Sequence, residues 1–308
     1  TSRATYNPHI DSFHYRKMGG LVSTLAFPVP DRHRSEPVLK YQGNRLVWLT
    51  TRPSSSSASS EEGIRIPALY IQRPKSTFTL LYSHGNAEDL GILLHYLDEM
   101  SVALNVDIFA YEYPGYSMAE GEEPSEQGCY DAIDAAYEYL SRNINPYSIV
   151  LVGRSLGSGP TVHLASRTPH IAGTILQSPL ESGIRCVLGT CSSIALYPLD
   201  IFCNYAKVSN IQGPVLIFHG LADRVVPCRN GKALYALLQQ RPNHVPYDPV
   251  WIPGRGHNDI PHDLCLQLMQ EFLEFLASNH VPIAVDKEPI IVSKSTKSAA
   301  SDPLLAWS

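Results

Sequence analysis

The chain has 308 residues, a formal net charge of −5 at pH 7 and a hydrophobic fraction of 44%. This length allows one large α/β domain or two ordinary ones, and the apolar fraction supports a sizeable core, which excludes wholesale disorder. The acidic balance leaves no surplus of positive charge to neutralise phosphates, so a nucleic-acid partner is not expected.

The N-terminal part of the chain is irregular. Residues 1–43 are mixed in composition and contain prolines, and we expect them to wrap the domain surface as an extension. A short apolar run predicts a strand at 46–49, and alternating residues predict another at 64–71. Between these strands, the serine-rich run 53–62 predicts a flexible loop at a hairpin tip rather than a domain boundary.

From residue 77 onward, short apolar runs alternate with apolar residues at helical spacing. The runs predict strands at 77–82, 106–111, 148–152, 171–176, 214–218 and 250–252. The helical spacing predicts helices at 90–104, 129–140, 156–166, 230–238 and 264–276. This alternation indicates an α/β fold with a mostly parallel central sheet of about eight strands and helices on both faces. In such sheets the chemistry gathers at the carboxyl ends of the strands.

The loop after the predicted strand 148–152 has the pattern G-x-S-x-G. It reads Gly-Arg-Ser-Leu-Gly at 153–157 and joins a strand to a helix, which is the context of a nucleophile elbow. The glycines permit a tight turn whose apex presents the serine hydroxyl, so Ser155 is the candidate nucleophile. A plain glycine-rich packing or phosphate turn is the alternative, although the Gly-Lys-Ser/Thr of a Walker motif does not follow.

A serine nucleophile needs a neighbouring base, and that base needs an orienting acid. In folds with a nucleophile elbow the chain order is serine, acid, histidine. Asp223 follows the predicted strand 214–218, and His257 follows the predicted strand 250–252. Each is also typical of an ordinary loop residue when taken alone. Together with Ser155, in this order and each at a strand end, they predict a catalytic triad.

Acyl transfer also requires hydrogen-bond donors for the developing oxyanion. The backbone amides of the residue after the nucleophile and of a residue in the loop after the third strand usually supply them. Leu156 is the first candidate, and Asn86 is the second, with Ala87 as its alternative. An ordinary turn followed by a helix N-cap is the other interpretation of residues 83–87. Helix N-terminal amides suit an anion in either case.

The other histidines and the cysteines are assigned structural roles. His84 and His219 precede glycines at strand ends and are expected to be satisfied structural groups. Asp259 is a rival acid, but it lies too close in sequence to His257 for the usual geometry and is expected to fix the loop. The six cysteines lack the paired spacing of zinc ligands and are expected to be reduced thiols. Neither a metal nor another cofactor is expected.

Five sequence blocks resemble those of a known family. They are SHGNAEDLG at 83–91, YEYPGY at 111–116, GRSLG at 153–157, SPLESG at 178–183 and GHNDI at 256–260. Within the α/β-hydrolase superfamily they resemble the α/β hydrolase domain-containing protein 17 family, and the related Bem46-like hydrolases share several of them. The resemblance covers about 46–276 and implies a serine hydrolase that removes palmitate from protein cysteines. It places the nucleophile, acid and base on Ser155, Asp223 and His257.

Two departures from the family's pattern limit what the resemblance implies. Ser117 stands where the family usually has a glycine after the tyrosine at 116, which changes one wall of the cleft. The family's palmitoylated N-terminal cysteine cluster has no counterpart, since the first cysteine is Cys129. Lipid-anchored targeting is therefore not carried over. We expect a cytoplasmic protein, with peripheral contact to membranes left open.

The predicted triad belongs to one sheet, which decides the domain organisation. Residues 44–280 are expected to form a single α/β-hydrolase domain, followed by a flexible tail at 281–308. Residues 181–210 lie where this fold often inserts a small lid. Within them, the uncharged stretch 186–199 is too short to span a membrane. It either lines an acyl-chain groove or packs as an ordinary helix.

The sequence favours a serine hydrolase that cleaves an acyl ester or thioester, with an acylated protein or a lipid as substrate. A palmitoyl-protein thioesterase (a depalmitoylase) or a lipid esterase is the preferred hypothesis, and no obligatory protein partner is evident. Glu181 and Tyr116 are the candidate substrate-binding residues. One alternative is a serine peptidase of the aminopeptidase type, for which Glu181 is the candidate anchor of the substrate amine. The other is a catalytically inactive scaffold on the hydrolase fold.

Overall fold

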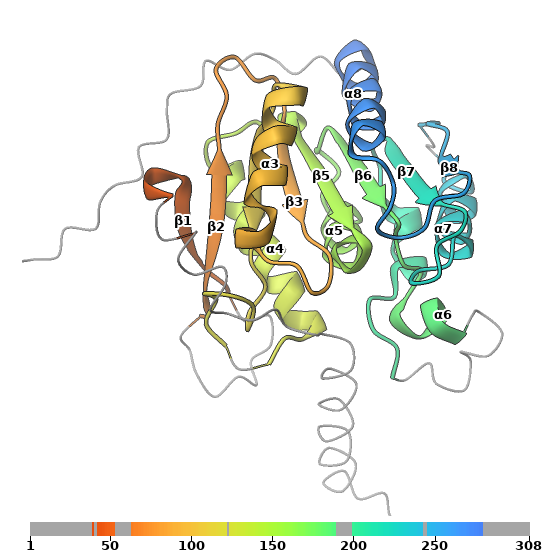
Figure 1. Cartoon of the computed structure of the whole chain (residues 1–308), viewed down its shortest axis with the longest axis horizontal. Coiled ribbons are helices and arrows are strands. Elements are labelled where there is room, and N and C mark those ends of the chain that lie inside the picture. The colour runs from red at the N-terminus through yellow and green to blue at the C-terminus, as the bar shows by residue number, and fades with distance from the viewer. Residues whose placement is uncertain are drawn as a thin grey trace, which may run out of the picture.

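An eight-stranded sheet forms the centre of the computed structural model (Figure 1). The structure describes residues 39, 42–52, 63–121, 123–188, 199–242 and 245–279. The strands are β1 (Leu46–Thr50), β2 (Arg65–Ile71), β3 (Thr79–Ser83), β4 (Asp107–Tyr111), β5 (Ile149–Arg154), β6 (Gly173–Gln177), β7 (Val215–Gly220) and β8 (Val250–Ile252). They lie in the order β1-β2-β4-β3-β5-β6-β7-β8.

Most neighbouring strands in this sheet are parallel, as the sequence predicts. Only β2 runs antiparallel to its neighbours β1 and β4. In the β1–β2 pair Thr50 lies opposite Arg65, so the connection that contains residues 53–62 joins two paired strands. In the β3–β5 pair Ser83 lies opposite Gly153. The loops that follow β3 and β5 therefore leave the sheet side by side.

Helices cover both faces of the sheet. They are α3 (Leu90–Leu104), α4 (Glu126–Ser141), α5 (Ser158–Ala165), α6 (Gly183–Leu188), α7 (Arg229–Leu238) and α8 (His262–Asn279). The core residues of α3 and α8 pack on one face, and those of α4, α5 and α7 pack on the other (Figure 1). The predicted fold class, a mostly parallel sheet with helices on both sides, is confirmed.

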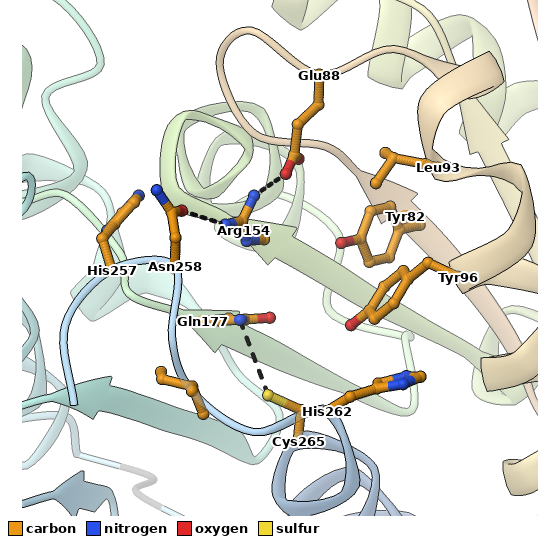
Figure 2. A pocket seen from close by; sticks show the side chains of 11 residues that line it. Tyr82, Glu88, Leu93, Tyr96, Arg154, Gln177, His257, Asn258, His262 and Cys265 are labelled. Atoms are coloured by element: carbon orange, nitrogen blue, oxygen red, sulfur yellow. Dashed lines mark hydrogen bonds and ion pairs between the residues drawn. The ribbon is translucent and has the colours of Figure 1, made fainter.

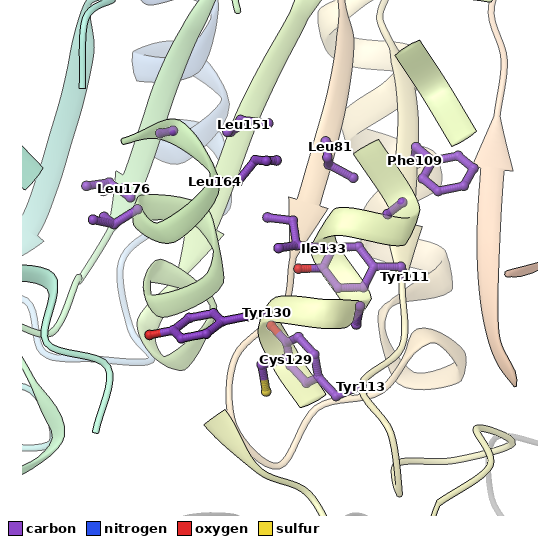
Figure 3. Close-up of a cluster of buried hydrophobic side chains, with 14 of the residues drawn as sticks. Leu81, Phe109, Tyr111, Tyr113, Cys129, Tyr130, Ile133, Leu151, Leu164 and Leu176 are labelled. Atoms are coloured by element: carbon purple, nitrogen blue, oxygen red, sulfur yellow. The ribbon is translucent and has the colours of Figure 1, made fainter. Parts of the chain in front are cut away.

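Alternate strand residues enter two separate hydrophobic cores. In β3, Leu80 and Tyr82 pack with α3 and α8, whereas Leu81 packs with α4 and α5 on the opposite face. Figure 3 shows this second core, where Tyr111 of β4 lies beside Ile133 of α4. Because both faces are covered, the strands are apolar at nearly every position. This burial is the reason why the sequence presents them as continuous apolar runs.

The helix after β3 begins at a capped residue. The side chain of Asp89 accepts a hydrogen bond from the amide of Ile92 at 2.9 Å, which satisfies one of the unpaired donors at the start of α3. At the other end, Asn105 adopts a left-handed conformation with a φ of 49° and closes the helix. The segment 84–88 is thus a short connection held between a strand and a capped helix.

Several predicted segments lie wholly or partly outside the described residues. They include most of the N-terminal extension, the serine-rich run 53–62, residues 189–198 of the lid segment and the tail 281–308, so the proposed domain boundaries remain predictions. At the start of the lid segment the structure places α6. No helix that the structure describes is both long enough and apolar enough to cross a bilayer.

Candidate active site

The nucleophile candidate sits at a strained turn between β5 and α5. Ser155 has a φ of 52°, in the left-handed region that non-glycine residues avoid, and it opens a short 3-10 turn at Ser155–Gly157. A Cβ atom added at Gly153 would lie 2.7 Å from the carbonyl oxygen of Gly157. One added at Gly157 would lie 2.1 Å from the carbonyl oxygen of Ser83. Both glycines are therefore required by backbone contacts, as the sequence predicts for a nucleophile elbow.

The three predicted triad side chains meet at the carboxyl edge of the sheet. His257 Nε2 lies 2.9 Å from Ser155 Oγ, and His257 Nδ1 lies 2.7 Å from Asp223 Oδ2. Since the aspartate can only accept, Nδ1 carries the proton that it donates, and Nε2 is left to accept the serine hydroxyl proton. The loops after β5, β7 and β8 thus place the candidate nucleophile, acid and base in one hydrogen-bonded line.

The carboxylate of Asp223 is held in its ionised form. Its Oδ1 accepts the amides of Val225 at 2.9 Å and Val226 at 2.8 Å. Burial by itself would raise the pKa of Asp223, but the hydrogen bonds from His219 and His257 and from the Val226 amide lower this pKa well below its usual value. An ionised acid at this position stabilises a protonated His257.

His219, for which the sequence predicts only a structural role, contacts the candidate acid. Its Nε2 lies 3.2 Å from Asp223 Oδ2 and 2.7 Å from the carbonyl oxygen of Val226, and its side chain is fully buried. Both neighbours accept, so Nε2 carries the proton and the ring braces the same carboxylate oxygen that His257 contacts. A signal was present in the sequence, because His219 lies at the end of β7 only four residues before Asp223.

The two predicted oxyanion donors lie on adjoining backbone segments. Leu156 is the second residue of the 3-10 turn that leads into α5, where backbone amides lack helical partners. The close contact between Gly157 and the carbonyl of Ser83 shows that the loop after β3 packs directly on the elbow. In that loop, the Ala87 amide donates to Asn86 Oδ1 at 3.2 Å. Asn86 stays the predicted second donor, with Ala87 as its alternative.

The side chains of the two candidate substrate-binding residues bond to residues other than the triad. The hydroxyl of Tyr116 donates to Asn86 Oδ1 at 2.8 Å and so braces the loop after β3. The carboxylate of Glu181 accepts from Arg185 Nη1 at 2.6 Å and is only 7% exposed. Ser117 follows Tyr116 and stands where the family usually has glycine. It is buried and has a φ of 45°.

A pocket of about 260 Å³ lies beside His257 (Figure 2). Arg154 and Gln177 line it, and Figure 2 shows the hydroxyl groups of Tyr82 and Tyr96 directed toward its centre. It is smaller than the roughly 300–1,000 Å³ of pockets that enclose a drug-sized ligand. Leu93 and Ile260 add apolar surface to its wall, so the lining combines polar and apolar groups. The predicted acyl-chain groove at 186–199 lies largely outside the described residues.

Metal ligation and disulfide formation have no visible basis in the described part of the chain. Within it, no three His, Cys, Asp or Glu side chains are grouped to hold a metal ion. The five cysteines in these ranges are free thiols, and burial raises the pKa of Cys265, which lies in the pocket, to about 11. Cys191 lies outside the described residues.

Comparisons with known proteins extend these observations. The prolyl oligopeptidase family model matches residues 199–280. The α/β hydrolase domain-containing protein 17B of Xenopus laevis is 37% identical over 279 residues, which are 85% of this chain and 93% of the relative. The chain belongs to the α/β hydrolase domain-containing protein 17 family. The 17C protein of Xenopus laevis is also similar, with 32% identity over 286 residues, 90% of this chain and 88% of the relative.

Membership of the protein 17 family confirms the resemblance drawn from the five sequence blocks and makes this chain an α/β hydrolase. Its fold is shared with much more distant proteins. An esterase of Pyrococcus furiosus aligns with a TM-score of 0.59 at 16% identity, covering 81% of this chain and 97% of that one. At this identity the likeness shows the α/β-hydrolase fold alone.

Proposed function

We propose that this α/β hydrolase is a serine hydrolase that cleaves acyl esters or thioesters, with Ser155 as nucleophile, His257 as base and Asp223 as orienting acid. The observation that carries the proposal is the hydrogen-bonded line from Ser155 Oγ through His257 to Asp223, with spacings of 2.9 and 2.7 Å. These spacings lie within the reach that proton transfer requires.

In the proposed acylation step, Ser155 Oγ attacks the carbonyl carbon while His257 Nε2 takes its proton. The negative charge moves to the carbonyl oxygen, where the amides of Leu156 and Asn86 stabilise it. The tetrahedral intermediate collapses, the bond to the alcohol or thiol breaks, and His257 gives its proton to the leaving oxygen or sulfur. The product of this step is an ester between the acyl group and Ser155.

Deacylation repeats the sequence with water as the nucleophile. His257 takes a proton from water as the water oxygen attacks the acyl carbon. The second tetrahedral intermediate releases the carboxylic acid, and the proton returns to Ser155 Oγ. The ionised Asp223 stabilises the imidazolium that forms in each step and keeps the ring in its productive tautomer.

For the substrate, we propose a palmitoylated protein, which makes the enzyme a depalmitoylase, with a lipid ester as the other option. The support is membership of the protein 17 family together with the five sequence blocks. For the location of the enzyme, we propose the cytoplasm with peripheral contact to a membrane, where substrates of both kinds are found. A series of p-nitrophenyl esters and acyl thioesters from two to sixteen carbons tests the acyl part, and a strict preference for acetyl esters would contradict it.

A serine peptidase is the second candidate, since residues 199–280 match the prolyl oligopeptidase family model. An aminopeptidase needs an acidic anchor for the substrate amine, and Glu181 was the candidate. Its carboxylate is engaged by Arg185 at 2.6 Å, which weakens this assignment. Aminoacyl anilides measured beside the ester series decide between the two activities.

Labelling with a fluorophosphonate probe tests the nucleophile directly. The wild-type chain is expected to label, and Ser155→Ala is expected to lose all labelling because the attacking oxygen is gone. Ser166→Ala is the matched control, since Ser166 follows α5 and its hydroxyl donates only to the carbonyl of His163. Full labelling of Ser155→Ala would refute the nucleophile assignment, and an unlabelled wild-type chain would favour the inactive-scaffold alternative.

A further inference from the structure

One guanidinium group joins three loops around the proposed site. Arg154 Nη2 donates to Asn258 Oδ1 at 2.7 Å, and Arg154 Nη1 donates to Glu88 Oε1 (Figure 2). The other carboxylate oxygen of Glu88 accepts the amide of Gly85 at 2.7 Å. The side chains of Arg154 and Glu88 are only 17% and 18% exposed, so solvent screens this ion pair less than a surface pair.

Each member of this network lies within two residues of the proposed machinery in the sequence. Arg154 precedes the nucleophile, Asn258 follows the base, and Glu88 lies in the loop that carries the second oxyanion donor. The contacts span 66 and 104 residues of the chain. They therefore join the loops after β3, β5 and β8 at the point where their relative placement sets the reaction geometry.

We propose that Arg154 is a positioning residue that aligns the His257 loop and the oxyanion loop with Ser155, acting through Asn258 and Glu88. This inference rests on the proposed function, because it assigns a role relative to that triad. A guanidinium suits the task, since its planar fork holds donors in two fixed directions at once. A lysine ammonium is a single point and cannot reproduce that geometry.

The packing around the network leaves it little freedom. A Cβ atom at Gly85 would lie 2.9 Å from Glu88 Oε2 and 3.1 Å from Arg154 Nη1, so the glycine lets the fork lie directly against the oxyanion loop. On the other side, Asp259 accepts the amide of Gly256 at 2.5 Å and stiffens the turn that carries His257. A rigid turn transmits a shift of Asn258 to the neighbouring imidazole.

Proton transfer tolerates little change in the distance between the reacting groups, and this determines the expected effect on catalysis. A misplacement of about 1 Å costs on the order of 100-fold in rate, although no reacting group is lost. Loss of the Arg154 links is thus expected to lower kcat by a larger factor than it raises KM, although the three network residues also line the pocket beside His257. A purely structural ion pair would lower the folding stability without this selective effect on kcat.

The closing experiment compares four variants with a matched control. Arg154→Met and Asn258→Leu remove the hydrogen bond between the two side chains and keep their bulk, whereas Asn258→Asp keeps the accepting Oδ1. The control, Arg167→Met, removes a different ion pair, the one with Asp134 on the surface. We expect kcat to fall about 10- to 100-fold in the first two variants. It should stay near the wild-type value in Asn258→Asp and in the control.

The fourth variant combines Arg154→Met with Asn258→Leu. If Asn258 acts only through Arg154, the double variant is no slower than Arg154→Met alone, because its link is already lost. Losses that multiply would show two independent effects and overturn the proposal. Failure of Asn258→Asp to retain activity would overturn it as well, since the acceptor is still present in that variant.

Amide hydrogen exchange separates failure of this proposal from failure of the proposed function. If the wild-type chain is not labelled by the fluorophosphonate probe, the serine-hydrolase assignment falls, but exchange still tests the network. Asn258→Leu is expected to speed exchange in segment 254–260, and Arg154→Met to speed it in 254–260 and in 84–88. Unchanged exchange in both segments would show that Arg154 does not hold these loops.

Discussion

The Nε2 atom of His84 lies 2.8 Å from Oε1 of Glu112, and both side chains are completely buried. The other ring nitrogen, Nδ1, lies 2.9 Å from the carbonyl oxygen of Gly85. Both polar ends of the ring are therefore engaged inside the protein. The ring of Tyr113 lies 4.2 Å from that of His84 and packs against it. A buried hydrogen-bonded pair thus supports the loop that carries Asn86.

Loss of this pair is expected to destabilise the fold. Glu112→Leu leaves the buried His84 ring without its partner and also removes the acceptor for the Leu90 amide. Each buried polar group left without a partner costs about 1–3 kcal/mol in the free energy of unfolding. Urea denaturation measures this change. Glu138→Leu is the control, because that residue belongs to exposed pairs and should cost less than about 1 kcal/mol.

A second prediction concerns Asp223. Asp223→Asn keeps the shape of the acid but removes the charge that orients and stabilises His257, so kcat is expected to fall by about 10³- to 10⁴-fold. Steady-state assays on the preferred ester measure this loss. A variant that retains more than a tenth of wild-type kcat would remove Asp223 from the triad.

The same substitution changes how stability depends on acidity. Because the folded-state pKa of Asp223 is lowered, its stabilising contribution is complete above the unfolded value of about 3.9 and is lost as pH falls further. The stability difference between wild type and Asp223→Asn should therefore shrink from pH 6 to pH 3. Urea unfolding at both pH values measures it, and a difference independent of pH would contradict the ionised acid.

A third prediction tests the brace on Asp223. His219→Phe removes the N–H group that donates to Asp223 Oδ2. The buried carbonyl of Val226 loses the same donor. We expect a cost of about 1–3 kcal/mol in the free energy of unfolding. We expect kcat to fall roughly tenfold, which is at least two orders of magnitude less than the loss expected for Asp223→Asn. His219→Gln restores a donor and should recover part of both losses.

The exposed His95 on α3 offers the control for this experiment. It is paired only with Glu99 at the surface and is 87% exposed, so His95→Phe should leave kcat unchanged. Equal kcat values for His219→Phe and the control would show that His219 has no part in holding the acid.

Most of the fold was predictable because its strands are buried on both faces. The predicted strand 77–82 and the observed β3 (Thr79–Ser83) differ by two residues at one end and one at the other, and the helices agree similarly. The prediction of a helix from 156 was early, since a 3-10 turn at Ser155–Gly157 intervenes before α5. That turn contains the strained backbone of Ser155, and the spacing of apolar residues along the sequence does not predict such strain.

Only some residues of the candidate site could be predicted from the sequence. Ser155, Asp223 and His257 could be picked out because a local motif, a fixed chain order and strand ends identify them without coordinates. Arg154 could not, because its role depends on partners 66 and 104 residues away. The residues next to Arg154 and Glu88 in the sequence form no pattern that predicts a contact between these two side chains at one edge of the sheet.

The last prediction concerns His163, whose ring stacks on that of Tyr130 at 3.8 Å. Burial, together with the positive charges of Arg167 and Lys207, lowers the pKa of His163 to about 3. The folded protein therefore keeps this ring neutral at a pH where the unfolded chain, with a pKa near 6.5, takes up a proton. Its contribution to stability is complete above about pH 6.5 and declines as pH falls, by at most about 1.4 kcal/mol per pH unit.

His163→Phe keeps an aromatic ring against Tyr130 and removes the titrating group. Urea unfolding at pH 7, 6, 5 and 4 is expected to show a shallower loss of stability in this variant than in the wild-type chain, since the proton uptake of the unfolded state at this position is abolished. His95→Phe should follow the wild-type curve, because that ring is 87% exposed. Parallel curves for wild type and His163→Phe would mean that the buried ring accepts a proton in the folded state as readily as in the unfolded one.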